Sequence, residues 1–169
     1  MVFWEKKMAT TVQQYLETAF EHDAEYVDGR IVERPMPKYL HALMQRFLIR
    51  VLELNGTDLI ALPEQRLKVA ETRYRVPDIC LTSEVPDEDE GILLKPPYLC
   101  VEILSPDDRT ADTLEKVSEY LAMGVAYVWL IDPKTVTGEV LTVDGVHTVS
   151  DGVFEAGEIV VDAKNFRPN

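Results

Sequence analysis

The sequence predicts an α/β (α+β) fold, and three patterns support that fold class. Two segments repeat apolar residues at helical spacing, several shorter segments are rich in β-branched and aromatic residues, and turn signals that contain glycine separate them. The chain of 169 residues has no low-complexity segment or internal repeat, and 46% of its residues are hydrophobic. A chain of this size and composition can bury a full core as one globular domain.

The N-terminal part predicts two helices with a hairpin between them. The expected elements are a short helix capped by Thr10 or Thr11 that ends at Phe20, a hairpin over residues 25–33, and a helix from Pro37 to Leu54. Asp28-Gly29 is a strong two-residue turn signal and indicates the hairpin. In the second helix apolar residues recur every three or four positions, and Asn55-Gly56 is typical of a helix end.

The C-terminal part predicts strands around one further helix. The expected strands are Leu59–Val69, Tyr74–Thr82, Pro97–Ser105 and Val125–Ile131, followed by short strands around Asp144-Gly145 and Asp151-Gly152. The helix runs from about Asp108 to Met123 and ends at Gly124. An acidic segment over residues 84–90 is interpreted as a solvated hairpin loop rather than a calcium site.

Two carboxylates stand at positions where hydrophobic strands would place apolar residues. Asp78 lies among the apolar residues of segment 76–81, and Glu102 lies among those of segment 99–104. Burying an ionised carboxylate without compensation costs several kcal/mol, so a fold tolerates two of them if they bind a cation, share a proton or reach the surface. Two converging acids make a metal site the leading interpretation.

One strand register brings the two acids together. If the strands pair antiparallel with Asp78 opposite Glu102, Cys80 falls opposite Cys100, and alternation puts each cysteine on the face of its neighbouring acid. We expect both cysteines to be free, buried thiols, because a zinc site would need more ligands at motif spacing.

A lysine in the last predicted helix is the third candidate site residue. Lys116 falls inside the apolar arc formed by Leu114, Val117, Tyr120 and their neighbours. A lysine on an apolar face usually extends its ammonium outward along its methylene groups. Here the preceding strand already carries Glu102, so the ammonium of Lys116 can reach the same site.

The charge and hydropathy of the chain limit its partners. Seventeen basic residues against 30 acidic ones give a net charge of −13, which argues against broad adhesion to nucleic acid. Glu64, Arg66 and Lys68 alternate on one predicted strand, and Arg73 and Arg75 follow. Such residues could contact phosphates, although a solvated sheet face explains them equally well. No apolar stretch reaches the roughly 20 residues of a membrane span, and Met1–Thr10 lacks the apolar core of a secretory signal, so we expect a cytoplasmic protein without a membrane partner.

The residues taken together resemble the Uma2 family, a branch of the PD-(D/E)xK restriction-endonuclease-like nucleases. The resemblance rests on the order and spacing of Arg75-Val76-Pro77-Asp78, residues 101–106, Lys116, Glu119-Tyr120 and residues 124–133. It implies a single restriction-endonuclease-like domain over residues 1–169, with a core over about 10–142 and a short-stranded extension over 143–169. The implied fold is a mixed, mostly antiparallel sheet flanked by helices.

The resemblance also implies an endonuclease that hydrolyses phosphodiester bonds in DNA with Mg²⁺, or Mn²⁺ in its place. Carried over to this chain, Asp78 and Glu102 bind the metal, the backbone carbonyl of Ile103 adds a ligand, and Lys116 orients or activates the attacking water. The usual lysine two residues after the second acid is absent, since Leu104 stands there, so Lys116 would have to reach in from the next helix.

Two accessory positions and two other interpretations stay open. Glu33 is a further metal ligand, an orienting group or a surface acid, and His41 is a packed histidine or a base. A catalytically silent relative would use the same fold as a binding module. A hydrolase with paired carboxylates would need a sugar cleft with stacking aromatics, but Trp129 lies in an apolar strand.

Many related nucleases work as homodimers, and the tail from Phe154 to Phe166 is a candidate interface.

Overall fold

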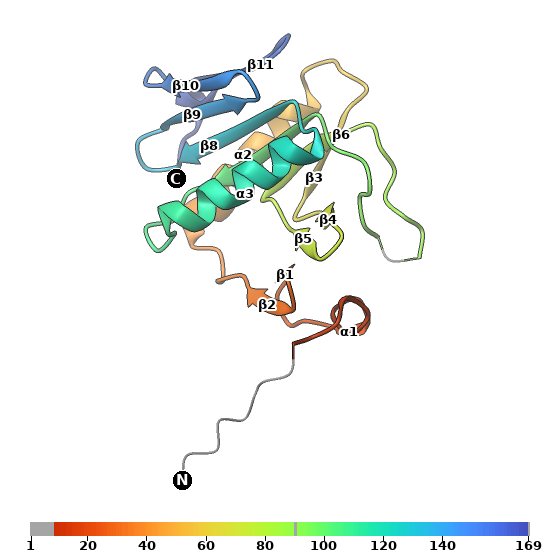
Figure 1. Ribbon diagram of the computed structural model, residues 1–169. Helices are drawn as coiled ribbons and strands as arrows, with labels where there is room; N and C mark the ends of the chain where they lie inside the picture. Colours follow the sequence, from red (N-terminus) through yellow and green to blue (C-terminus); the bar gives the residue numbers. More distant parts are fainter. Residues whose placement is uncertain (1–8, 90, 169) are drawn as a thin grey trace.

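The structure is a computed structural model that describes residues 9–89 and 91–168, and its architecture is mixed α+β (Figure 1). The helices are α1 (Val12–Glu17), α2 (Tyr39–Glu53) and α3 (Thr110–Met123), with a 3₁₀ turn at Ala163–Asn165. The first strands are β1 (Ala24–Val27), β2 (Arg30–Glu33), β3 (Ile60–Pro63), β4 (Leu67–Ala70), β5 (Arg73–Arg75) and β6 (Ile79–Thr82). The later strands are β7 (Leu99–Ile103), β8 (Tyr127–Asp132), β9 (Thr137–Thr142), β10 (Gly145–Val149), β11 (Val153–Ala156) and β12 (Ile159–Asp162).

The strands form three sheets, and the predicted mostly antiparallel arrangement flanked by helices is confirmed. The largest sheet has the order β10-β9-β8-β7-β6-β3, a second sheet has the order β2-β1-β5-β4, and β11 pairs with β12. Within the largest sheet the described neighbours are antiparallel except for β7 and β8, which are parallel. A parallel pair needs a long crossover connection, and α3 supplies it between these two strands.

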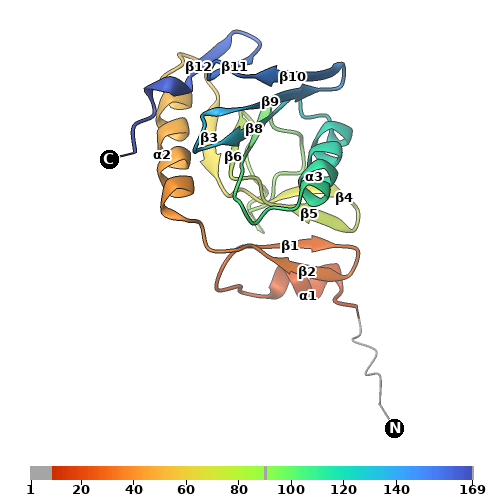
Figure 2. The ribbon, with the colours of Figure 1, turned by 90° about the vertical axis from the view of Figure 1, so that its left-hand side faces the viewer.

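The two long helices cover opposite faces of the largest sheet (Figure 2). On one face α2 packs its apolar side against the odd-numbered residues of β6, β7 and β8; this core includes Met44, Leu48, Leu52, Ile79, Val101, Trp129 and Ile131. On the other face α3 packs against the even-numbered residues of the same strands; this core includes Cys80, Cys100, Val117, Tyr120, Val128 and Leu130. Because Glu102 is also even-numbered, its side chain lies on the α3 face.

The predicted register between the two acid-bearing strands is confirmed where the strands pair. In β6 and β7, Cys80 lies opposite Cys100 and Ile79 lies opposite Val101. Asp78 immediately precedes β6, and one further step of this register places it opposite Glu102. Both cysteines are free and fully buried, as expected.

Two expected strands are each broken, which corrects the sequence prediction. The segment predicted as Leu59–Val69 is β3 and β4, which belong to different sheets, and Glu64 between them has a left-handed backbone with φ of 51°. The segment predicted as Tyr74–Thr82 is β5 and β6, separated at Pro77, which lacks the N–H that a sheet ladder requires. The two breaks meet, because the N–H of Glu64 donates to the carbonyl of Asp78 at 3.2 Å.

The ends of the chain hold further differences from the prediction. Helix α1 has the expected cap, since the hydroxyl of Thr11 accepts from the N–H of Gln14, but it ends before Phe20. Phe154 and Phe166, which bound the tail named as a candidate interface, are themselves buried in the core that includes α2, and the interface stays a prediction. Residues 1–8, where the sequence predicts no secretory signal, lie outside the described part of the chain. In that part, no helix combines the length and the apolar character needed to cross a membrane.

A chain of buried ion pairs joins the four-stranded sheet to α3. Nη1 of Arg75 lies 3.0 Å from Oε2 of Glu25, and Nε of Arg75 lies 2.6 Å from Oε2 of Glu119. The other oxygen of Glu25 accepts the N–H of Val76 at 3.1 Å and lies 3.0 Å from the ammonium of Lys116. Only 5% of the Arg75 and Glu25 side chains is exposed, so each charge depends on its partners for compensation.

Replacing Arg75 with Gln (R75Q) should lower the free energy of unfolding by roughly 3 kcal/mol, because Glu25 and Glu119 lose a buried partner. Urea unfolding at neutral pH measures the change. The matched control is R46Q, which removes an exposed arginine of α2 and should alter stability by less than about 0.5 kcal/mol. Equal stability of the two variants would show that the ion-pair chain contributes little.

The stability contributed by Glu25 should depend on pH in the acid range. Burial alone would raise its pKa, but Lys116, Arg75 and the N–H of Val76 outweigh burial and lower the pKa of Glu25 below its ordinary value of 4.5. Such a carboxylate stabilises the folded protein above its unfolded pKa, and the contribution is lost as pH falls through the lower folded pKa. The difference in unfolding free energy between wild type and E25Q should therefore be full at neutral pH and shrink below about pH 4.5. A difference that stays constant down to about pH 3 would contradict an ionised Glu25.

Candidate active site

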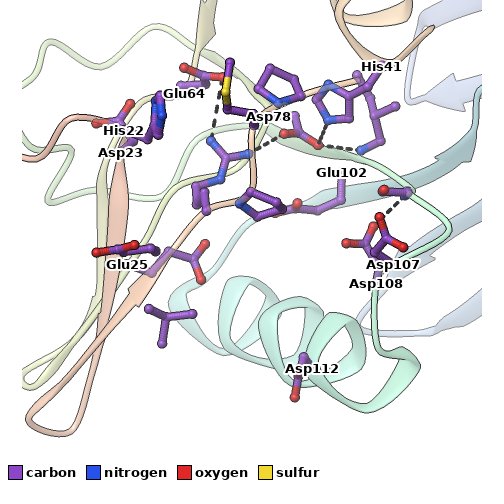
Figure 3. A pocket seen from close by; sticks show the side chains of 18 of the residues that line it. His22, Asp23, Glu25, His41, Glu64, Asp78, Glu102, Asp107, Asp108 and Asp112 are labelled. Carbon is purple, nitrogen blue, oxygen red and sulfur yellow. Dashed lines mark hydrogen bonds and ion pairs between the residues drawn. The ribbon is translucent and has the colours of Figure 1, made fainter. Parts of the chain in front are cut away.

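The three predicted catalytic residues line one cavity of about 600 Å³. Its walls come from the end of β2, the start of α2, the residue before β6, the end of β7, and the first turns of α3. Figure 3 shows Asp78, Glu102 and His41 grouped in this cavity, with Glu25 and Glu64 beside them. The structure thus brings together residues that lie far apart in the sequence.

Asp78 is held by three donors from three parts of the chain. Its Oδ1 accepts a hydrogen bond from the guanidinium of Arg34, and its Oδ2 accepts the backbone N–H of Ile103 at 2.7 Å. Nε2 of His41 lies 3.1 Å from the same Oδ2. Burial alone would raise the pKa of Asp78, but His41 and Arg34 outweigh it and lower the pKa, so this carboxylate is ionised at neutral pH.

Glu102 is held through only one of its oxygens. Its Oε1 accepts the hydroxyl of Tyr120 at 2.6 Å and lies 3.0 Å from the ammonium of Lys116. No donor among the described residues contacts Oε2, and the side chain lines the cavity. Burial raises the pKa of Glu102, and nearby Asp78 and Glu25 add to the rise while Lys116 opposes it. The two acids therefore differ in environment although they share one cavity.

Lys116 reaches the site from α3 as the sequence predicts. Its ammonium lies between two carboxylates, 3.0 Å from Glu102 and 3.0 Å from Glu25. Burial would lower the pKa of Lys116, but these acids outweigh burial and raise it. The side chain is accordingly an ammonium at neutral pH, and it can donate hydrogen bonds but cannot accept a proton.

The two accessory candidates have different places in the structure. His41 contacts Asp78, and this contact raises the pKa of His41 even though burial would lower it; its Nδ1 is buried without a hydrogen-bond partner in the described chain. Glu33 is exposed on the cavity rim at the end of β2, and no ion pair joins it to a described residue. The next residue, Arg34, makes the contact with Asp78 instead.

Among the described residues, three whose side chains contact side chains of the predicted set had no site role assigned from sequence. Arg34 follows an exposed strand, so nothing local marks it as a partner of Asp78, 44 positions later. Tyr120 lies on the predicted apolar arc of its helix and in the Glu119-Tyr120 pair of the resemblance, but neither pattern predicts a role for its hydroxyl. Glu25 shows the same anomaly as Asp78, an acid in a strand whose four residues are all buried, and this signal could have identified it.

The basic residues expected as phosphate contacts are engaged elsewhere. Arg73 and Arg75 form ion pairs with acids of β1, its turn and α3. The guanidinium of Arg66 lies over the ring of Tyr15, 4.8 Å from its centroid, and Lys68 pairs with Glu71. Glu64 turns toward the cavity, 3.8 Å from the guanidinium of Arg34. These side chains therefore do not form a free basic strip.

The donor chemistry of the cavity fits a hard divalent cation. Mg²⁺ is commonly bound by one or two carboxylates, with water and substrate oxygens completing its coordination. Asp78 and Glu102 supply two carboxylates, and the unpaired Oε2 of Glu102 belongs to a side chain that lines the cavity. In the described ranges no group of three or more His, Cys, Asp or Glu side chains forms a metal cage.

Comparisons with known proteins identify a family and a solved structure that are similar to this chain. The chain matches the family model Uma2, described as "Putative restriction endonuclease", over residues 12–165. Among solved structures, it is similar to a putative nuclease belonging to DUF820 from Anabaena variabilis ATCC 29413, with a TM-score of 0.79 and 26% sequence identity. That match covers 92% of this chain and 96% of the other. Among curated proteins, none matches. Since the family model extends over most of its length, the chain belongs to the Uma2 family.

Proposed function

We propose that this protein is a metal-dependent endonuclease that hydrolyses phosphodiester bonds in DNA. The observation that carries the proposal is the meeting of Asp78, Glu102 and Lys116 in one cavity, with one oxygen of Glu102 free. The description of the Uma2 family as putative restriction endonucleases and the similar putative nuclease point to the same reaction class.

Asp78, Glu102 and the backbone carbonyl of Ile103 would hold the metal ion, which we propose to be Mg²⁺ with Mn²⁺ as a substitute. When bound, such an ion offsets the negative charge of a phosphodiester and lowers the pKa of a coordinated water. Ile103 also fixes Asp78 directly, because its N–H donates to Oδ2 of that carboxylate at 2.7 Å. Strand β7 therefore supplies one acid and orients the other.

Lys116 acts in this scheme as a hydrogen-bond donor. Its ammonium is held by Glu102 and Glu25, which keep it charged, so its role is to orient the attacking water or a phosphate oxygen. Proton removal from the water falls to another group or to solvent, because an ammonium has no lone pair.

The charge of the cavity makes the metal important for substrate binding as well as for chemistry. Ten of its lining side chains are Asp or Glu, and four are Lys or Arg. A polyanion such as DNA would be repelled by this lining unless cations offset part of the charge. The net charge of −13 acts in the same direction.

Calorimetric titration with Mg²⁺ and Mn²⁺ tests the metal site. Wild type should bind, and Asp78→Ala and Glu102→Ala should each lose binding, because each removes one of the two carboxylates that the site supplies. The control Glu53→Ala removes an exposed acid at the other end of α2 and should bind like wild type. Thermal melts check that each variant is folded. Binding that survives in both acid variants would place the metal elsewhere.

A plasmid-nicking assay with Lys116→Met tests the catalytic role of the lysine. At saturating metal the nicking rate should fall by about 100-fold or more, since a donor aimed at the reacting groups is lost. A variant that nicks at the wild-type rate would remove Lys116 from the mechanism. If wild type neither binds metal nor nicks DNA, the fold serves as a silent binding module instead.

A further inference from the structure

Tyr120 carries a hydroxyl that the packing of α3 does not require. The ring is fully buried in the core between α3 and the large sheet, among the apolar side chains of Val117, Val128 and Leu130. Its hydroxyl donates to Oε1 of Glu102 at 2.6 Å, a distance typical of a strong hydrogen bond to a carboxylate. The polar atom of Tyr120 is thus directed at a residue of the cavity.

This contact distinguishes the two oxygens of Glu102. Oε1 receives both the hydroxyl of Tyr120 and the ammonium of Lys116, whereas Oε2 has no donor among the described residues. The terminal torsion of a glutamate is soft, so an unrestrained carboxylate would rotate and present either oxygen. Two donors from adjacent turns of α3 oppose that rotation. The carboxylate is held with the same oxygen toward the helix.

We propose that Tyr120 is a positioning residue that fixes Oε1 of Glu102 so that Oε2 is presented to the metal ion. The inference rests on the proposed function, because it assigns Tyr120 to the metal site of that reaction. Tyr120 itself touches neither metal nor substrate in this scheme and acts through Glu102. Hydrogen-bond partners of this kind commonly change metal affinity by 10- to 100-fold when they are removed.

The chain contains a matched control for the loss of a buried tyrosine hydroxyl. Tyr15 is also fully buried, and its hydroxyl donates to the backbone carbonyl of Ala24 at 2.7 Å. Neither tyrosine lines the cavity, but the hydroxyl of Tyr120 contacts Glu102, whereas that of Tyr15 contacts a backbone carbonyl outside the predicted site. Tyr120→Phe and Tyr15→Phe therefore remove the same group from equally buried sites. If Tyr120 were merely structural, both variants would lose a few degrees in Tm and resemble each other in every other measurement.

Calorimetric Mg²⁺ and Mn²⁺ titrations of the full chain should separate the two variants. We expect Tyr120→Phe to raise the Kd at least 10-fold, and Tyr15→Phe to stay within about twofold of wild type. At saturating metal, Tyr120→Phe should lower the kcat of plasmid nicking and leave KM nearly unchanged. Equal metal affinity of Tyr120→Phe and Tyr15→Phe, with wild type binding normally, would overturn the inference and leave the proposed function intact. Absence of binding by wild type would overturn both.

A double-variant cycle tests whether Tyr120 acts through Glu102. Glu102→Asp keeps the charge but shortens the side chain, which withdraws the carboxylate from the hydroxyl of Tyr120. In that background Tyr120→Phe should change the Kd for Mn²⁺ by less than about twofold, because the contact is already lost. A full 10-fold effect in the Glu102→Asp background would mean that Tyr120 does not act by positioning Glu102.

Discussion

Three neighbouring buried carboxylates, each of whose charge must be compensated by cations or hydrogen-bond donors, constrain the rest of the structure. Glu25, Asp78 and Glu102 are each less than a tenth exposed, and an isolated ionised carboxylate in such a place would cost several kcal/mol. Each is compensated by a group from another element, and the ammonium of Lys116 lies between Glu25 and Glu102. The ion pairs of Lys116 with these two acids also fix the position of α3 on the sheet.

The two breaks in the strands lie beside Asp78, one of these carboxylates. The carbonyl of Asp78 accepts the N–H of Glu64, which extends the register of β3 and β6 by one step. It also accepts the side-chain amide of Gln45 at 2.8 Å. The break at Pro77 lets the chain pass from the small sheet to the large one. Asp78 thus lies where both sheets meet the start of α2, and His41 and Arg34 can reach it from different sides.

Part of this arrangement could be predicted because it follows from alternation and periodicity. The register that pairs Cys80 with Cys100 follows from the two-residue repeat of strands, and the inward place of Lys116 follows from a helical wheel. The break at Glu64 could not be predicted, because a left-handed backbone at a non-glycine residue leaves no local pattern. The contact between Arg34 and Asp78 could not be predicted for a different reason, because it depends on how two sheets meet and not on the neighbours of Arg34 in the sequence.

Asp78 and Glu102 differ in how many of their carboxylate oxygens are free to bind the proposed metal ion. Both oxygens of Asp78 are engaged by donors, whereas Glu102 keeps one oxygen free. A divalent cation that approaches Asp78 would therefore compete with Arg34 for Oδ1. The other guanidinium nitrogen of Arg34 already lies 3.8 Å from Glu64, so a second acid is at hand to receive the displaced charge. In the proposed function, the affinity for the metal would therefore be reduced by the free energy that the contacts of Asp78 with Arg34 contribute.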